Sequence, residues 1–140
     1  MKDFLTSRSQ KVVLEGKYGE SCPVLSGVPQ GTVLAPLLFL LYINDIPNNI
    51  QCTLRLYADD ILIYSTIQST DDCNRLQHDL FTLQEWASLW QMEFNPAKCE
   101  HLVITNKQFF IQHSYKISGH TIKNVPSAKY LGITFDQNLT

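Results

Sequence analysis

Two apolar runs flank a pair of aspartates in the stretch Leu54-Arg55-Leu56-Tyr57-Ala58-Asp59-Asp60-Ile61-Leu62-Ile63-Tyr64. Both runs are rich in leucine, isoleucine and tyrosine, and the break is short enough for a tight turn, so the pattern predicts a β-hairpin. Asp59 and Asp60 are then at its tip. Adjacent carboxylates repel each other unless a hard divalent cation lies between them, for which carboxylate oxygens are natural ligands. Ordinary turn chemistry is the alternative, because aspartate tolerates turn backbone and hydrates well.

The composition indicates one soluble domain. The chain has 140 residues, of which 44% are hydrophobic and 11% aromatic, enough for a real core, and this makeup disfavours intrinsic disorder. Its longest apolar run, Val33–Ile43, is shorter than the ~20 residues of a membrane span and contains Pro36. Without a signal-peptide pattern at the start, we expect an intracellular protein without a membrane partner. The scattered cysteines are predicted to be reduced packing residues: Cys22, Cys52, Cys73 and Cys99.

The net charge of −2 hides an uneven distribution along the chain. Residues 1–31 carry four basic and three acidic residues, residues 32–105 carry three and nine, and residues 106–140 carry four and one. The chain as a whole therefore lacks the basic footprint that is usual for a nucleic-acid binder. The acidic centre fits a cation site, but a solvated helix face accounts for most of it, carrying Asp71, Asp72, Asp79 and Glu85.

The first third of the chain contains a loop with two possible roles. After a predicted hairpin that turns at Gly16–Gly19, the loop Gly27-Val28-Pro29-Gln30-Gly31 leads into an apolar segment. A glycine loop before a helix can hold a nucleotide or a template strand, or it can be a plain connector. Thr32 is predicted to cap a helix over residues 34–42, with Pro36 in or near its first turn. Because this helix is apolar on nearly every side, we expect it to pack against the sheet that carries the acid pair.

The last two thirds of the chain contain a second helix and further strands. Ser69-Thr70-Asp71-Asp72 has the form of a capping box, and Asn95-Pro96 is predicted to end the helix. One apolar helix face is marked by Leu76, Leu80, Leu83, Trp86, Ala87 and Trp90. We further predict a turn at Lys98, a strand over 101–105, a hairpin over 115–122 and a strand over 129–135.

Five blocks in order resemble the reverse transcriptase domain, most closely the non-LTR retrotransposon branch of the insect jockey type. The blocks are Gly27–Gly31 continuing through 32–39, residues 42–47, Tyr57–Asp60, residues 95–98 and Lys129–Gly132. The resemblance implies an α+β fold, a partial right-hand polymerase palm whose antiparallel sheet carries the acidic hairpin and packs on two helices. It covers residues 1–140, from after the family's first catalytic aspartate block through the primer-grip strand.

The resemblance also implies RNA-templated DNA synthesis, with an RNA template, a DNA primer and a dNTP as partners. Asp59 and Asp60 would help hold two Mg²⁺ ions, of which one lowers the pKa of the primer hydroxyl and the other stabilises the leaving pyrophosphate. Lys98 would act near the pyrophosphate. The residues that would border the nucleotide and template are Gly27, Pro29, Gln30 and Gly31. Those that would contact the primer are Tyr57, Lys129, Tyr130, Leu131 and Gly132.

Two departures from the family pattern affect the expected activity. The family's site needs a further aspartate from a block before the glycine loop, and neither it nor the fingers is found in this sequence. Two carboxylates alone should bind Mg²⁺ poorly, so we expect a truncated palm that is inactive by itself. The alternatives are a non-catalytic or degenerate remnant that binds nucleic acid or protein, and another palm enzyme, which the glycine loop and Tyr130-Leu131-Gly132 disfavour. Cys99 also stands where the family often has threonine.

Overall fold

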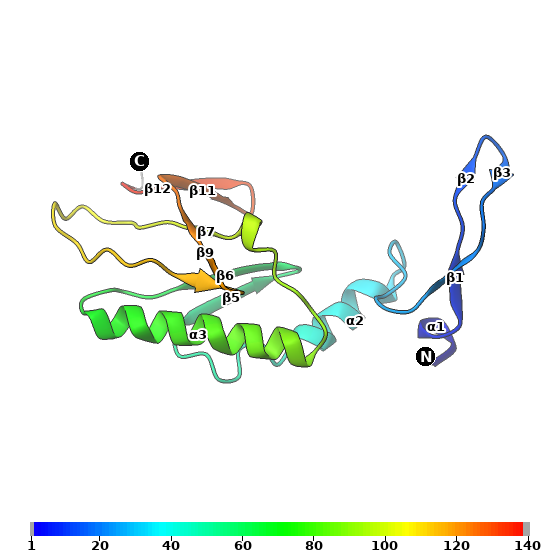
Figure 1. The fold of residues 1–140 in the computed structure, drawn as a ribbon, viewed down its shortest axis with the longest axis horizontal. Helices are drawn as coiled ribbons and strands as arrows, with labels where there is room; N and C mark the ends of the chain where they lie inside the picture. The colour runs from blue at the N-terminus through cyan, green and yellow to red at the C-terminus, as the bar shows by residue number, and fades with distance from the viewer. Residues whose placement is uncertain (1, 139–140) are drawn as a thin grey trace. The chain divides into compact units, whose positions relative to one another are not determined.

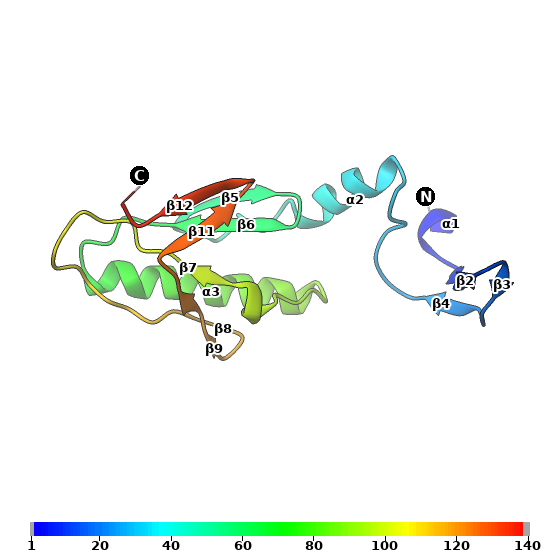
Figure 2. The same ribbon diagram turned by 90° about the horizontal axis from the view of Figure 1, so that it is seen from above.

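The computed structural model describes residues 2–138, drawn in Figures 1 and 2. Its elements fall into two compact units, Met1–Asp45 and Ile46–Thr140. Within the described residues the strands form two-stranded sheets, and with the two longer helices they fit the predicted α+β class. None of the helices described has the length and apolarity that crossing a membrane requires.

The first unit contains two short hairpin pairs and one longer helix. Its strands pair antiparallel, β1 with β4 and β2 with β3. The elements are α1 (Lys2–Leu5), β1 (Arg8–Gln10), β2 (Val13–Leu14), β3 (Lys17–Tyr18), β4 (Cys22–Val24) and α2 (Leu34–Ile43). The β2–β3 turn falls on Glu15 and Gly16, earlier than predicted, because both residues have the positive φ of a type I′ turn (49° and 77°).

The start of α2 differs from the prediction. Pro36 does lie in its first turn, but Thr32 does not cap it: the N-cap is Val33, which makes no side-chain cap. The Thr32 hydroxyl instead donates to the carbonyl of Pro29, 2.9 Å away, and so braces the preceding loop. Several leucines of α2 are exposed, among them Leu37 and Leu41. The packing of this helix against the sheet of the other unit stays a prediction.

The second unit contains the predicted acidic hairpin. Strands β5 (Thr53–Tyr57) and β6 (Asp60–Tyr64) pair without a break from Thr53 opposite Tyr64 to Tyr57 opposite Asp60. Helix α3 (Thr70–Leu89) runs alongside this hairpin in both views (Figures 1 and 2). At 1.5 Å per residue this helix is about 30 Å long, longer than either strand of the hairpin.

Helix α3 begins as predicted but ends sooner. Its capping box is complete, and Cys73, Leu80, Leu83 and Ala87 are buried on one face. The helix ends at Leu89, because Gln91 takes a left-handed φ of 54°, and it does not reach Asn95-Pro96. Trp90 is therefore the C-cap and is 37% exposed, so the predicted apolar face effectively ends at Ala87.

The C-terminal elements correct two predictions. They are η1 (Pro96–Lys98), β7 (Glu100–His101), β8 (Lys116–Ile117), β9 (His120–Thr121), β10 (Lys123–Asn124), β11 (Ser127–Tyr130) and β12 (Ile133–Asp136). The β8–β9 hairpin agrees with prediction, but the strand at 101–105 is only β7, and it pairs parallel with β10 rather than antiparallel. The single strand predicted over 129–135 is the β11–β12 hairpin, because Leu131 and Gly132 both have positive φ (50° and 86°) and form a type I′ turn.

Two glutamines join α3 to the β8–β9 hairpin. The Gln77 amide nitrogen donates to the carbonyl of Lys116 at 2.9 Å, and the Lys116 N–H donates to the Gln77 oxygen at 2.8 Å. Two helical turns later, Gln84 accepts the N–H of Ser118 at 2.9 Å. Gln77 thus satisfies both the backbone N–H and the carbonyl of Lys116, as a neighbouring strand would.

Replacing Gln77 by Glu should destabilise this unit by about 1 kcal/mol, the usual net value of one hydrogen bond. The carboxylate can still accept from the Lys116 N–H, but it cannot donate to the Lys116 carbonyl and repels it. Urea unfolding of the 140-residue chain measures the change. Asn74→Asp makes the same amide-to-acid change at an exposed position of α3 and should have a smaller effect; equal effects would contradict this role of Gln77.

Candidate functional site

The tip of the β5–β6 hairpin brings three predicted site residues together. Asp59 is the second residue of the two-residue turn, and Asp60 opens β6 directly opposite Tyr57, the last residue of β5. All three are exposed, Tyr57 to 62%. Because the pairing fixes their register, the aromatic ring and both carboxylates are presented at one end of a rigid element.

The other turn residue, Ala58, is in a backbone conformation that alanine rarely adopts. Its φ is +49°, whereas Asp59 has no positive φ, and this is the sign pattern of a type II′ hairpin turn. Glycine is the usual residue at that position, because a Cβ is strained there. The hairpin therefore carries local strain directly beside Asp59, as functional sites often do.

Two substitutions at Ala58 test this strain. Glycine should stabilise the unit by about 0.5–1 kcal/mol, because relief of strain outweighs the added freedom of the unfolded chain. Valine should destabilise it by about 1 kcal/mol or more, because a β-branched residue tolerates positive φ least. Urea unfolding gives both values. Ala97→Gly is the matched control at an exposed residue of η1 without positive φ, and there glycine should destabilise; the same sign at both sites would contradict the strain.

The chemistry of the tip is that of hard oxygen ligands. Within residues 2–138, no hydrogen bond or ion pair engages the carboxylate of Asp59 or Asp60, and both face solvent. The same residues contain no group of three or more His, Cys, Asp or Glu side chains placed to hold a metal ion. The two exposed carboxylates offer the oxygen ligands that a divalent cation prefers, and their role as metal ligands stays a prediction.

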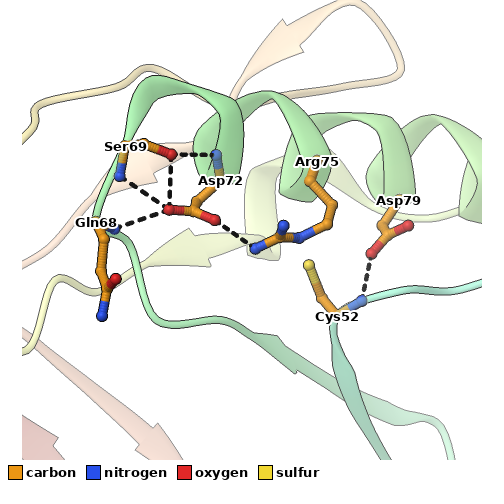
Figure 3. Close-up of polar contacts among 6 residues, drawn as sticks. All are labelled: Cys52, Gln68, Ser69, Asp72, Arg75 and Asp79. Atoms are coloured by element: carbon orange, nitrogen blue, oxygen red, sulfur yellow. Dashed lines mark hydrogen bonds and ion pairs between the residues drawn. The ribbon is translucent and has the colours of Figure 1, made fainter.

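The base of the hairpin is held by an acid that sequence reasoning misplaced. Asp79 was predicted on a solvated face, but its side chain is fully buried. Its carboxylate accepts the N–H groups of Gln51 (3.1 Å) and Cys52 (2.7 Å), and the bond from Cys52 is drawn in Figure 3. These residues immediately precede β5. The signal was its position: Asp79 falls within the apolar stripe of α3, three residues after Leu76 and four before Leu83.

The start of α3, which follows β6 after a short connection, is held by Asp72. Its carboxylate accepts the N–H groups of Gln68 (2.9 Å) and Ser69 (2.8 Å), the hydroxyl of Ser69, and a hydrogen bond from Arg75 (Figure 3). These hydrogen bonds stabilise the charged form and hold the pKa of Asp72 well below its usual range. The bond from the Gln68 N–H has the largest effect, those from Ser69 come next, and that from Arg75 is smaller. Asp72 was therefore also more than a solvated charge.

Cys52 lies beside both Asp79 and Arg75, the partner of Asp72. Burial, followed by the neighbouring Asp79 carboxylate, raises the pKa of the Cys52 thiol, while Arg75 opposes this shift. The guanidinium of Arg75 lies between Asp72 and Cys52 (Figure 3). All four cysteines are free of disulfides, as predicted, but the prediction that they are packing residues is wrong for Cys22, which is exposed.

The glycine loop lies in the first unit and is held by an arginine that was not predicted. Arg8 donates to the carbonyls of Ser26 (3.1 Å) and Gly27 (2.6 Å). Gly27 and Gly31 both have positive φ (73° and 83°), so glycine is needed at both positions for backbone reasons alone. Gln30 is exposed and Pro29 partly so. The acid pair lies in the other unit, so the proximity of this loop to the acid pair stays a prediction.

The remaining predicted site residues lie on separate elements of the second unit. Lys98 is the exposed last residue of η1, whose first turn is capped by the Asn95 side chain accepting the Ala97 N–H at 3.0 Å. Lys129 and Tyr130 end β11, and Leu131 and Gly132 form the turn that follows. The roles of these residues toward pyrophosphate and primer stay predictions.

Comparison with known proteins gives one consistent match. Residues 1–135 match the family described as reverse transcriptase (RNA-dependent DNA polymerase). The chain is 31% identical over 149 residues to the RNA-directed DNA polymerase from mobile element jockey of Drosophila melanogaster. This match covers 100% of the chain and 16% of that protein. It is 33% identical over 150 residues to the probable RNA-directed DNA polymerase from transposon BS of the same organism, covering 100% and 17%.

Another fly relative has the same pattern. The probable RNA-directed DNA polymerase from transposon X-element of Drosophila melanogaster is 30% identical over 146 residues, again covering 100% of this chain and 16% of the relative. The chain thus spans only about a sixth of the length of these relatives. No solved structure matches it.

Proposed function

This chain belongs to the reverse transcriptase family, and on that premise we propose that it forms the palm part of an RNA-directed DNA polymerase, from after the first catalytic aspartate block through the primer-contacting strand. The observation that carries the proposal is the hairpin tip, where Asp59 and Asp60 are exposed, unpaired and fixed in register opposite Tyr57. The family works on a nucleic-acid template and primer with nucleotide substrates and a divalent metal; Mg²⁺ is our assignment.

The proposed mechanism assigns each carboxylate a simple task. Two Mg²⁺ ions, when bound, would activate the primer hydroxyl and neutralise the triphosphate. Asp59 and Asp60 hold negative charge and hard oxygens at the end of a stiff hairpin, which favours cations there without rearrangement during reaction. Tyr57 offers an exposed ring beside them, suited to packing against the primer terminus.

The other predicted residues would complete the substrate contacts. We assign Gly27, Pro29, Gln30 and Gly31 to contacts with the nucleotide and the template. Gly27 and Gly31 turn the backbone with positive φ, and because glycine has no side chain, a strand can approach the backbone closely there. Lys98 would neutralise charge near the pyrophosphate, for which its exposed ammonium is suited. The β11–β12 turn, with Lys129, Tyr130, Leu131 and Gly132, would contact the primer.

Primer extension on poly(rA)/oligo(dT) with Mg²⁺ tests the proposal. We expect incorporation by a chain extended upstream to include the family's preceding aspartate block, and none by the 140-residue chain, because two carboxylates are too few ligands. An inactive extended chain that is folded and binds the duplex would contradict the proposed function. Incorporation by the 140-residue chain that is lost in Asp59→Ala would contradict the need for a third carboxylate.

A second candidate, binding of nucleic acid without catalysis, is favoured by the basic C-terminal segment. Its four lysines are all exposed: Lys107, Lys116, Lys123 and Lys129. If they contact phosphates, affinity for a primer-template duplex should fall steeply with salt, with a slope near one per neutralised phosphate. Fluorescence anisotropy at several salt concentrations measures the slope. Lys129→Gln should lower it by about one, whereas Lys17→Gln, outside the segment, should leave it unchanged; salt-independent binding would rule this candidate out.

A further inference from the structure

The leg of the acidic hairpin that enters β5 is tied to α3. The buried carboxylate of Asp79 accepts the N–H groups of Gln51 and Cys52, and Figure 3 shows the bond from Cys52. Asp72, which caps α3 at Gln68 and Ser69, is seven residues earlier, almost two full helical turns, so the two acids lie on the same side of the helix.

The contact between Asp79 and the β5 leg is buried. The Asp79 carboxylate accepts two backbone N–H groups of this leg, so its charge is stabilised by the hairpin leg itself. A buried charge is costly unless it is hydrogen-bonded, and the leg therefore cannot leave the helix without exposing or orphaning it. Arg75 lies between the two acids: it pairs with Asp72 and lies close to Cys52, whose N–H is bonded to Asp79.

The tip is rigidly linked to this base. Five consecutive residue pairs connect Thr53–Tyr64 at the base with Tyr57–Asp60 at the tip, without a bulge. A shift or tilt at the base is therefore carried to Asp59 and Asp60, because the paired strands move together. A carboxylate displaced by about 1 Å can lower the rate of a two-metal reaction a hundredfold.

We propose that Asp79 is a positioning residue for the reaction assigned above: it sets where the carboxylates of Asp59 and Asp60 stand by fixing the hairpin base on α3. This inference rests on the proposed function for its catalytic part. Its structural part, that the base contacts keep the hairpin closed, is independent of activity.

Amide hydrogen exchange of the 140-residue chain tests the structural part. Asp79→Asn keeps the size of the side chain but removes its charge and replaces one of the two acceptor oxygens, which bond the N–H groups of Gln51 and Cys52, by a donor. Exchange of the β5–β6 amides should rise about tenfold or more, while β11–β12 amides change less than about twofold. Asp72→Asn, which changes the cap of α3 instead, should give a smaller rise in these amides. Hairpin exchange equal to wild type in Asp79→Asn, or a uniform rise throughout the unit, would overturn the proposal.

Primer extension by the upstream-extended chain tests the catalytic part. Asp79→Asn should lower kcat about tenfold to a hundredfold and raise the half-saturating Mg²⁺ concentration, with the KM for primer-template little changed. Loss of folding alone would reduce the active fraction and leave the Mg²⁺ midpoint where it was. Asp71→Asn removes an exposed acid of α3, and Gln77→Glu weakens the unit elsewhere; neither should move that midpoint. An unchanged midpoint in Asp79→Asn would overturn positioning, whereas an inactive wild-type chain would overturn the proposed function instead.

Discussion

Replacing Asp59 by Asn in the upstream-extended chain should lower the rate of primer extension about a thousandfold or more. Asparagine has the shape of aspartate and suits a turn equally well, but it supplies one neutral oxygen in place of a charged carboxylate. The charge that would attract and hold the cations at the hairpin tip is thereby halved. Single-turnover extension on poly(rA)/oligo(dT) measures the change separately from primer-template binding.

Folding stability should move in the opposite direction. Asp59 and Asp60 are neighbours with no cationic partner among the described residues, so removing one charge relieves repulsion and should raise the urea midpoint slightly. The control is Asp71→Asn, which removes a charge from exposed helix surface and should leave the rate unchanged. An Asp59→Asn rate within about tenfold of wild type would refute the role of this carboxylate.

Replacing Asp79 by Ala should destabilise the Ile46–Thr140 unit by about 2–4 kcal/mol, the range for orphaning buried groups bonded to a charge. The N–H groups of Gln51 and Cys52 lose their acceptor, and a space remains where the carboxylate was packed. Urea unfolding followed by the fluorescence of Trp86 and Trp90, both of which lie on α3 or its cap, gives the value.

The matched control for this substitution is Asp71→Ala, eight residues earlier on the same helix and exposed. Its effect should be at most a few tenths of a kcal/mol, because a surface charge near a helix N-terminus contributes only weakly. Similar losses in the two variants would mean that Asp79 acts merely as a charge and not as the acceptor that holds β5.

The parts of this fold that were predictable depend on local chemistry. The acidic hairpin follows from two apolar runs with an aspartate pair between them, and the start of α3 follows from Ser69 and Asp72 satisfying each other's backbone. The ends of elements were less predictable. Gln91 and Leu131 both adopt positive φ, which neither residue type signals, and each ended a helix or strand that hydrophobic pattern alone would have continued.

The sequence by itself determined the family and the exposed carboxylates at the hairpin tip, because motif order and strand register are both written along the chain. Only the tertiary structure decided what Asp79 does. Four acids on one helix look alike in sequence, and what distinguishes Asp79 from Asp71 is burial against the segment that leads into β5, 27 residues away, where two backbone N–H groups need an acceptor. Such a contact depends on which surfaces meet in space, and no local propensity encodes it.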